Sequence, residues 1–319
     1  MRFTLNITDP VHQELVELNI QDLAYRIANN TNTEISQILH SKGGYKYFLR
    51  LPLFSNFNYA GRNEETPHMV IKCCHKAGDR KFIAYEFKGH PYNKSEWYCA
   101  RLYIEQTLAK ELYKEYWSEL LVTDVHIAVG SDIPLSHLLF DKLRARKAGI
   151  YFNSNGEMEL IYMQPKNRTQ ELAIYDRHAK AKNRKLKFRP NEATRAELRL
   201  GKMRIPFTNF LVDHTYVDKF QSIKSYDFKK LADAKGLGRY ELMAIQSMGL
   251  IPFMRKHTKY ERTKLRKTIG PYLVPVININ SIKSMWSKQI SKISVMDQFK
   301  DIPASKEKKF KAMFNSKYL

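Results

Sequence analysis

The stretch 124-DVHIAV-129 alternates apolar with ionisable or small residues, as a half-buried β-strand does. Its odd positions, all Val or Ile, share one face, so Asp124 and His126 project together from the other. Two further stretches repeat the pattern, 171-ELAIYDR-177 and 195-RAELRL-200. Together the three stretches predict strands with one apolar and one polar face.

The second and third stretches add chemically active groups to the polar face. In the second stretch, Leu172 and Ile174 point to the core, and in the third stretch the apolar residues alternate in the same way. The residues left on the polar side are Ala173, Tyr175, Arg177, Arg195, Glu197 and Arg199. If the three strands are neighbours, one sheet face gathers Asp, His, Glu, Tyr and Arg side chains.

These side chains fit chemistry on a phosphodiester. A divalent metal held by His126 and Glu197, with Asp124 as a further ligand, would polarise a scissile phosphate. A tyrosine hydroxyl would attack phosphorus and form a covalent phosphotyrosine link. Arg195 and Arg199 would hold flanking phosphates, because planar guanidinium groups match phosphate oxygens. Each strand taken alone also fits an edge with solvated charges, whereas three in succession favour a site.

Tyr175 is the first candidate for the attacking group. Tyr151 and Tyr162 lie on nearby expected strands and are alternatives for the same role. The competing interpretation is that Tyr175 is one of 19 tyrosines and merely covers the sheet, since strands favour aromatic residues.

The composition points to a polyanionic partner. The chain has 319 residues with 54 Lys plus Arg against 32 Asp plus Glu, a formal charge of +22. Such an excess attracts nucleic acid. An anionic membrane is the lesser alternative, because we find no basic amphipathic helix or lipidation signal. Neither a secretory signal nor a long apolar stretch is evident, so we expect a cytoplasmic protein.

Two basic segments are candidate nucleic-acid contacts. Residues 177–189 form an expected basic loop between two site strands, a natural track for phosphates. Residues 255–267 follow two expected helices, and they either read a duplex or act as a positively charged buttress. The residues expected to contact nucleic acid are Arg177, Lys180, Lys182, Arg184, Lys185, Arg255, Lys256 and Arg262.

The order of elements predicts an α+β fold with a largely antiparallel central sheet, flanking helices and a C-terminal helical region. The expected strands cover residues 2–7, 45–53, 68–74, 81–88, 121–129, 159–164, 171–177 and 194–200. The expected helices follow Pro10 and cover residues 20–39 in two pieces, 95–119, 228–235 and 239–248. A polar tail ends the chain, and a domain boundary near Thr215 separates residues 1–215 from 216–319.

Several short motifs carry a family resemblance across residues 68–215. The segments 86-EFKGHP-91, 124-DVH-126, 173-AIYDR-177 and 195-RAELR-199, with the helix between the first two, resemble filamentous-phage gene-II-type replication initiators. They are also similar to rolling-circle plasmid initiators, and the fold of this family is related to the HUH endonucleases.

The resemblance implies a function for each part of the chain. Residues 1–215 would be a nickase domain that cuts one strand at an origin with Mg²⁺ or Mn²⁺, and residues 216–319 a basic DNA-binding or accessory region. Tyr175 would be the nucleophile, Glu197 the acid of the Arg-x-Glu strand, and His126 would stand where the family usually has Asp. The implied partners are origin duplex, single-stranded DNA and host replication proteins such as a helicase.

Two departures from the family pattern bear on the metal site. The family often has Glu five residues after the tyrosine, where this chain has Lys180, and the complete two-His motif of the HUH group is absent. Either His178 or Asp124 then completes the metal site, or metal binding is weak.

Two other functional classes remain open on the sequence alone. A non-catalytic origin-binding protein or repressor would use the C-terminal helices and the net charge, and a nucleic-acid packaging protein would need no cluster of Asp, His, Glu and Tyr.

Overall fold

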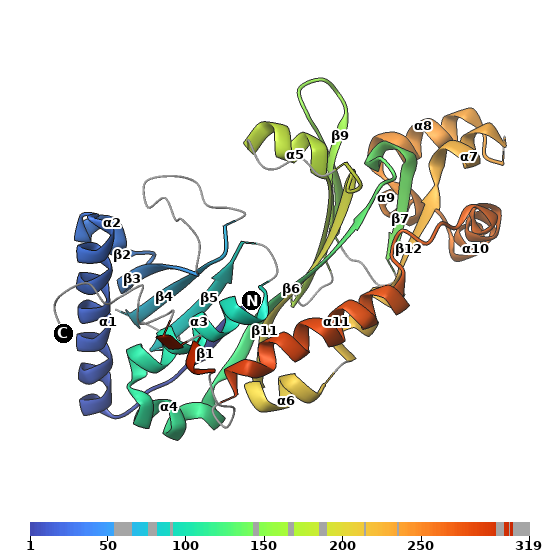
Figure 1. Cartoon of the computed structure of the whole chain (residues 1–319). Coiled ribbons are helices and arrows are strands. Elements are labelled where there is room, and N and C mark those ends of the chain that lie inside the picture. The colour runs from blue at the N-terminus through green and yellow to red at the C-terminus, as the bar shows by residue number, and fades with distance from the viewer. Residues whose placement is uncertain are drawn as a thin grey trace. The chain divides into compact units, whose positions relative to one another are not determined.

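The computed structural model describes residues 1–53, 66–75, 82–89, 92–142, 147–164, 169–184, 190–213, 215–234, 236–297, 303–305 and 307–308 (Figure 1). The chain forms two compact units, each assembled from separate stretches. The first comprises Met1–Asp124, Met203–Asp213 and Ser287–Leu319, and the second comprises Val125–Lys202 and His214–Trp286. Both units contain residues from before and after the expected boundary near Thr215.

The first unit is built on an antiparallel sheet with the strand order β2-β3-β4-β5-β1. Its strands are β1 (Arg2–Leu5), β2 (Leu39–Lys42), β3 (Tyr45–Pro52), β4 (His68–His75) and β5 (Ile83–Lys88). β6 (Leu121–Ser131) pairs antiparallel with β1 through its first residues and then continues into the second unit. The strands expected in this part of the chain are therefore present.

Helices of the first unit pack on this sheet and on one another. They are α1 (Pro10–Thr31), α2 (Ile35–Ile38), α3 (Lys94–Leu108), α4 (Lys110–Tyr116), η1 (Trp117–Glu119), α6 (Phe207–Val212) and η5 (Ser294–Met296). As the sequence predicts, α1 starts at an Asp9 cap with proline at its first position, and it ends at Asn32 with a left-handed backbone, φ 49°.

The single helix expected over residues 95–119 is wrong, because the chain breaks at Ala109 with φ 62°. The break redirects α4 so that Tyr113 donates its hydroxyl to the carbonyl of Met296. Arg101 of α3 also donates to the carbonyl of Asp297 at 2.8 Å. A left-handed residue is uncommon for alanine, and these contacts to η5 satisfy buried polar groups on both helices.

The second unit contains a five-strand sheet segment, β6-β11-β10-β9-β8, and a two-strand sheet, β12-β7. Its further strands are β7 (Leu138–Lys142), β8 (Lys147–Phe152), β9 (Met158–Gln164), β10 (Gln170–Asp176), β11 (Thr194–Pro206) and β12 (Ile223–Asp227). One face is apolar as expected, because Leu172, Ile174 and Leu198 are fully buried.

The helices of the second unit pack on its sheets and on one another. They are η2 (Leu135–His137), α5 (Arg177–Arg184), η3 (Thr215–Ser222), α7 (Phe228–Asp233), α8 (Arg239–Met248), α9 (Leu250–Arg255), α10 (Lys259–Ile269) and η4 (Gly270–Tyr272). The two helices expected on either side of the turn at residues 236–238 are confirmed as α7 and α8. Gly249, with φ 86°, lets α9 turn against Ile150, since an added Cβ would lie 2.9 Å from that side chain.

The expected polar tail is wrong for residues 279–293, which form α11 (Ile279–Ile293). Ile282, Trp286, Ile290 and Ile293 are buried at helical spacing, a pattern that hydrophobic periodicity does contain. Among the described residues, no helix is long and apolar enough to cross a membrane. The α+β class, with a large antiparallel sheet and flanking helices, is confirmed.

Candidate functional site

The register of the second unit's sheet brings the predicted site residues to one face. On antiparallel β10 and β11, Tyr175 lies opposite Arg195, Ala173 opposite Glu197, and Glu171 opposite Arg199. Alternate residues of a strand share a face, so these three pairs project to the side away from Leu172 and Ile174. We call this group, together with His126 of β6, the Tyr175 face.

Glu197 contacts both His126 and Arg199 on this face. Its Oε1 lies 3.5 Å from Nδ1 of His126, and its Oε2 accepts a hydrogen bond of 2.9 Å from Nη2 of Arg199. Burial disfavours the charged carboxylate, but His126 and Arg199 outweigh that effect and lower the pKa of Glu197 to about 2. Glu197 is therefore an anion at neutral pH.

The sequence reasoning missed Glu171 as a member of the site. Its Oε2 lies 4.0 Å from Nη1 of Arg199, and its Oε1 accepts a hydrogen bond of 3.1 Å from Gln164. Glu171 shares the strand parity of Tyr175, a signal that the sequence contains. Arg199 therefore lies between two carboxylates, Glu197 and Glu171, and its guanidinium is held in place on the sheet.

Tyr175 is on the predicted face but is more enclosed than the alternation suggests. Its exposed fraction is 9%, and Nζ of Lys180 lies 4.2 Å from its ring centroid. Burial raises the pKa of Tyr175, with Arg195 opposing the shift. The ring of Tyr175 is therefore enclosed on the sheet, with Lys180 over it.

Arg195 is fixed beside Tyr175 by a carboxylate that the sequence did not single out. Nη1 of Arg195 donates to Oε1 of Glu192 at 2.6 Å. The pKa of Arg195 is raised, because the nearby Tyr175 and the bond to Glu192 outweigh burial. The bond to Glu192 therefore fixes the guanidinium of Arg195, which lies on the strand next to Tyr175.

The two alternative tyrosines lie on the neighbouring strands β9 and β8. Tyr162 stands opposite Ala173, and burial together with a hydrogen bond to Glu171 raises its pKa to about 12. Tyr151 is 56% exposed. Tyr162 is thus engaged with Glu171, and Tyr151 lies further along the sheet, opposite Leu160.

The donors for a metal are the His126 imidazole and Glu197 Oε1. Asp124 belongs to the first unit, where it lies opposite Arg2 of β1, and His178 lies in the first turn of α5. Among the described residues, no three His, Cys, Asp or Glu side chains gather to hold a metal ion. A two-ligand set fits a cation that takes its remaining ligands from substrate phosphate and water, as Mg²⁺ often does.

The first basic segment differs from the expected loop. Residues 177–184 are the helix α5, because Asp176 caps the backbone N–H of Ala179 at 2.8 Å. Arg177 was expected to project outward, but it is buried with 4% exposure at the strand-to-helix turn. Lys180 is half-buried on Tyr175, and Lys182 is exposed. The Arg184 side chain and all of Lys185 lie outside the described residues.

The second basic segment ends α9 and forms α10. Arg255 and Lys256 are exposed, and Arg262 is half-buried. Arg266 has a structural role, since its Nε donates to the buried Asp141 of β7 at 3.1 Å. The segment therefore contains one arginine, Arg266, that stabilises the fold, and other cations that face solvent.

No family model matches the chain, and no curated protein matches it. A rolling-circle replication initiator protein from Geobacillus stearothermophilus matches with a TM-score of 0.35 and 12% identity, over 70% of this chain and 83% of that one. A likeness at this level assigns neither activity nor substrate.

Proposed function

We propose that this chain is a replication initiation protein that binds an origin and nicks one DNA strand through a covalent phosphotyrosine intermediate, as in rolling-circle replication. The observation that carries the proposal is the Tyr175 face, where a tyrosine, two oriented arginines and a His–Glu pair project from neighbouring strands. The family motifs in the sequence agree with it.

In the proposed step the hydroxyl oxygen of Tyr175 attacks phosphorus. The bond from phosphorus to one sugar oxygen breaks, that oxygen takes up a proton, and the tyrosine proton passes to solvent. Arg195 lies opposite the tyrosine and balances the charge that develops near it. Arg199, four residues further along β11, is oriented to hold a flanking phosphate.

His126 and Glu197 would hold a Mg²⁺ or Mn²⁺ ion, which would take its remaining ligands from water and substrate phosphate. When bound, such an ion supplies Lewis-acid polarisation of the phosphate. Without it, Glu197 still orients Arg199, and the low pKa of Glu197 keeps that contact charged at neutral pH.

A non-catalytic origin-binding role is the second candidate. The enclosure of Tyr175 and the exposed cations of α9 and α10 favour it, since DNA binding needs no accessible phenol. In that case Arg255, Lys256 and Arg262 would contribute most of the affinity.

Incubating the chain with a labelled single-stranded origin oligonucleotide and Mg²⁺ or Mn²⁺ separates the two. We expect a covalent adduct in a denaturing gel from the parent chain and none from Tyr175→Phe, which keeps the ring and its packing. Tyr162→Phe and Tyr151→Phe are the matched controls and should form adduct normally. A normal adduct yield from Tyr175→Phe would show that Tyr162 or Tyr151 is the nucleophile instead. No adduct from the parent chain or from any of the three variants would favour the non-catalytic role.

A further inference from the structure

The sheet of the first unit has a second polar face, unrelated to the Tyr175 face. On β3 and β4, Leu49 lies opposite Ile71, both fully buried, so the alternate pair Phe48 and Lys72 projects to the other side. Following the register through β5 and β1 adds further residues to that side. We call this group the Glu86 face, and its members are Arg2, Lys42, Phe48, Arg50, Lys72, Glu86 and Lys88.

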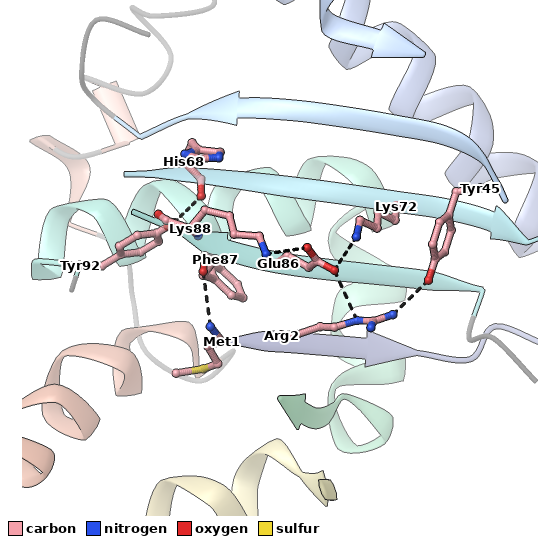
Figure 2. A network of polar contacts seen from close by, with 9 residues as sticks. All are labelled: Met1, Arg2, Tyr45, His68, Lys72, Glu86, Phe87, Lys88 and Tyr92. Carbon is pink, nitrogen blue, oxygen red and sulfur yellow. Dashed lines mark hydrogen bonds and ion pairs between the residues drawn. The ribbon is translucent and has the colours of Figure 1, made fainter. Parts of the chain in front are cut away.

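One buried carboxylate on this face is shared by three cations. Oε1 of Glu86 lies 2.6 Å from Nζ of Lys72 and 3.8 Å from Nε of Arg2, and its Oε2 lies 3.0 Å from Nζ of Lys88. Figure 2 shows Arg2 and Lys72 reaching Glu86 from the neighbouring strands β1 and β4, and Lys88 reaching it from the same strand, β5. Arg2 also donates from Nη2 to the hydroxyl of Tyr45 at 3.0 Å.

Cations also surround the ring of Phe48. The charged groups of Lys42, Lys72 and Arg50 lie 5.4, 5.6 and 5.9 Å from its centroid. The pKa values of two histidines on these strands reflect this positive charge. The pKa values of His40 and His68 are lowered, first by burial and then by Arg50 among other cations.

The Glu86 face carries more positive charges than negative ones. Against the five Lys and Arg members stand Glu86 and, opposite Arg2 on β6, Asp124. Two buried polar atoms, Nε of Arg2 and Oγ1 of Thr4, have no hydrogen-bond partner among the described residues. Thr4 is only 3% exposed and shares the strand parity of Arg2. Like charges held close together cost free energy unless an anion joins them.

We propose that the Glu86 face binds the phosphodiester backbone of DNA, as a contact separate from the Tyr175 face. Lysine and arginine groups with spare donors are the usual partners of phosphate oxygens. A membrane surface fits less well, because the aromatic member, Phe48, is only 8% exposed and offers no side chain for insertion. The choice of DNA rests on the proposed function, but the contact does not depend on nicking.

The test removes two of these charges and measures affinity against salt. Arg50→Gln combined with Lys88→Gln leaves Glu86 with Lys72 and Arg2, and the side chain of Lys88 is already 51% exposed. The control is Lys114→Gln, an exposed residue of α4 in the same unit. Binding of labelled single-stranded and duplex oligonucleotides is measured by fluorescence anisotropy without divalent metal, over about 50 to 200 mM salt.

We expect the double variant to lower the slope of log affinity against log salt by about 1.4 for single strands or about 1.8 for duplex, and the control to leave it unchanged. An unchanged slope on both DNAs, with an unchanged unfolding midpoint, would overturn this inference. If the double variant unfolds, Lys88→Gln alone should lower the slope by about half as much. The Tyr175→Phe variant tests nicking alone, because it should lose the covalent adduct and keep the parent's salt slope. The proposed nicking and the proposed DNA contact of the Glu86 face can therefore be refuted independently.

Discussion

Nδ1 of His126 lies 3.5 Å from Oε1 of Glu197, and this contact joins two strands that are separated by about 70 residues of chain. The His126 side chain is 43% exposed, whereas that of Glu197 is 16% exposed. His126 is thus accessible to a substrate, whereas Glu197 is held on the sheet by its hydrogen bond to Arg199.

His126→Ala should abolish or strongly reduce adduct formation while leaving the fold intact. The exposed imidazole can be truncated without creating a cavity, so the unfolding midpoint should change little. The check is adduct yield in Mg²⁺ and Mn²⁺ beside thermal unfolding. Normal yield in both metals would move the metal site away from this pair.

Glu197→Gln should change how stability depends on pH. The pKa of Glu197 falls from an ordinary 4.5 to about 2, so its stabilisation is complete above about pH 4.5 and is lost as the pH falls toward 2. The parent should exceed the variant by at most about 3 kcal/mol near pH 6, with the difference shrinking in acid. Urea unfolding at several pH values measures this, and a pH-independent difference would refute it.

Lys180→Gln should slow adduct formation by about three- to tenfold, because a cation over the tyrosine ring helps to balance the charge of the attacking oxygen. Its Nζ lies 4.2 Å from the Tyr175 ring centroid. Lys182→Gln, on the same helix and exposed, is the matched control and should react normally. Equal rates in both variants under single-turnover conditions would show that Lys180 acts only through net charge.

Arg266→Gln should destabilise the second unit by about 2 kcal/mol, since it leaves the buried carboxylate of Asp141 without its cation. Arg262→Gln on the same helix should cost little stability but weaken DNA binding. Denaturant unfolding and anisotropy measured on both variants separate the buttress from the DNA contact. The assignment is wrong if Arg266→Gln unfolds at the same denaturant concentration as the parent.

Much of the fold follows from local sequence patterns. The cap at Asp9, the turn at residues 236–238 and the alternation around Glu197 each depend on residues within a few positions of one another. The helix of residues 279–293 also had a readable pattern, in the spacing of Ile282 and Trp286, although the prediction there was wrong.

The sequence by itself determined which residues share a strand face, because alternation in a β-strand is a property of the backbone. Only the tertiary structure decided which strands are neighbours and what covers them. Register placed Glu171 beside Arg199 and brought Arg2 and Lys72 to Glu86, while packing enclosed Tyr175 and Arg177. Pairing and burial depend on residues far apart in the chain, which no local pattern specifies.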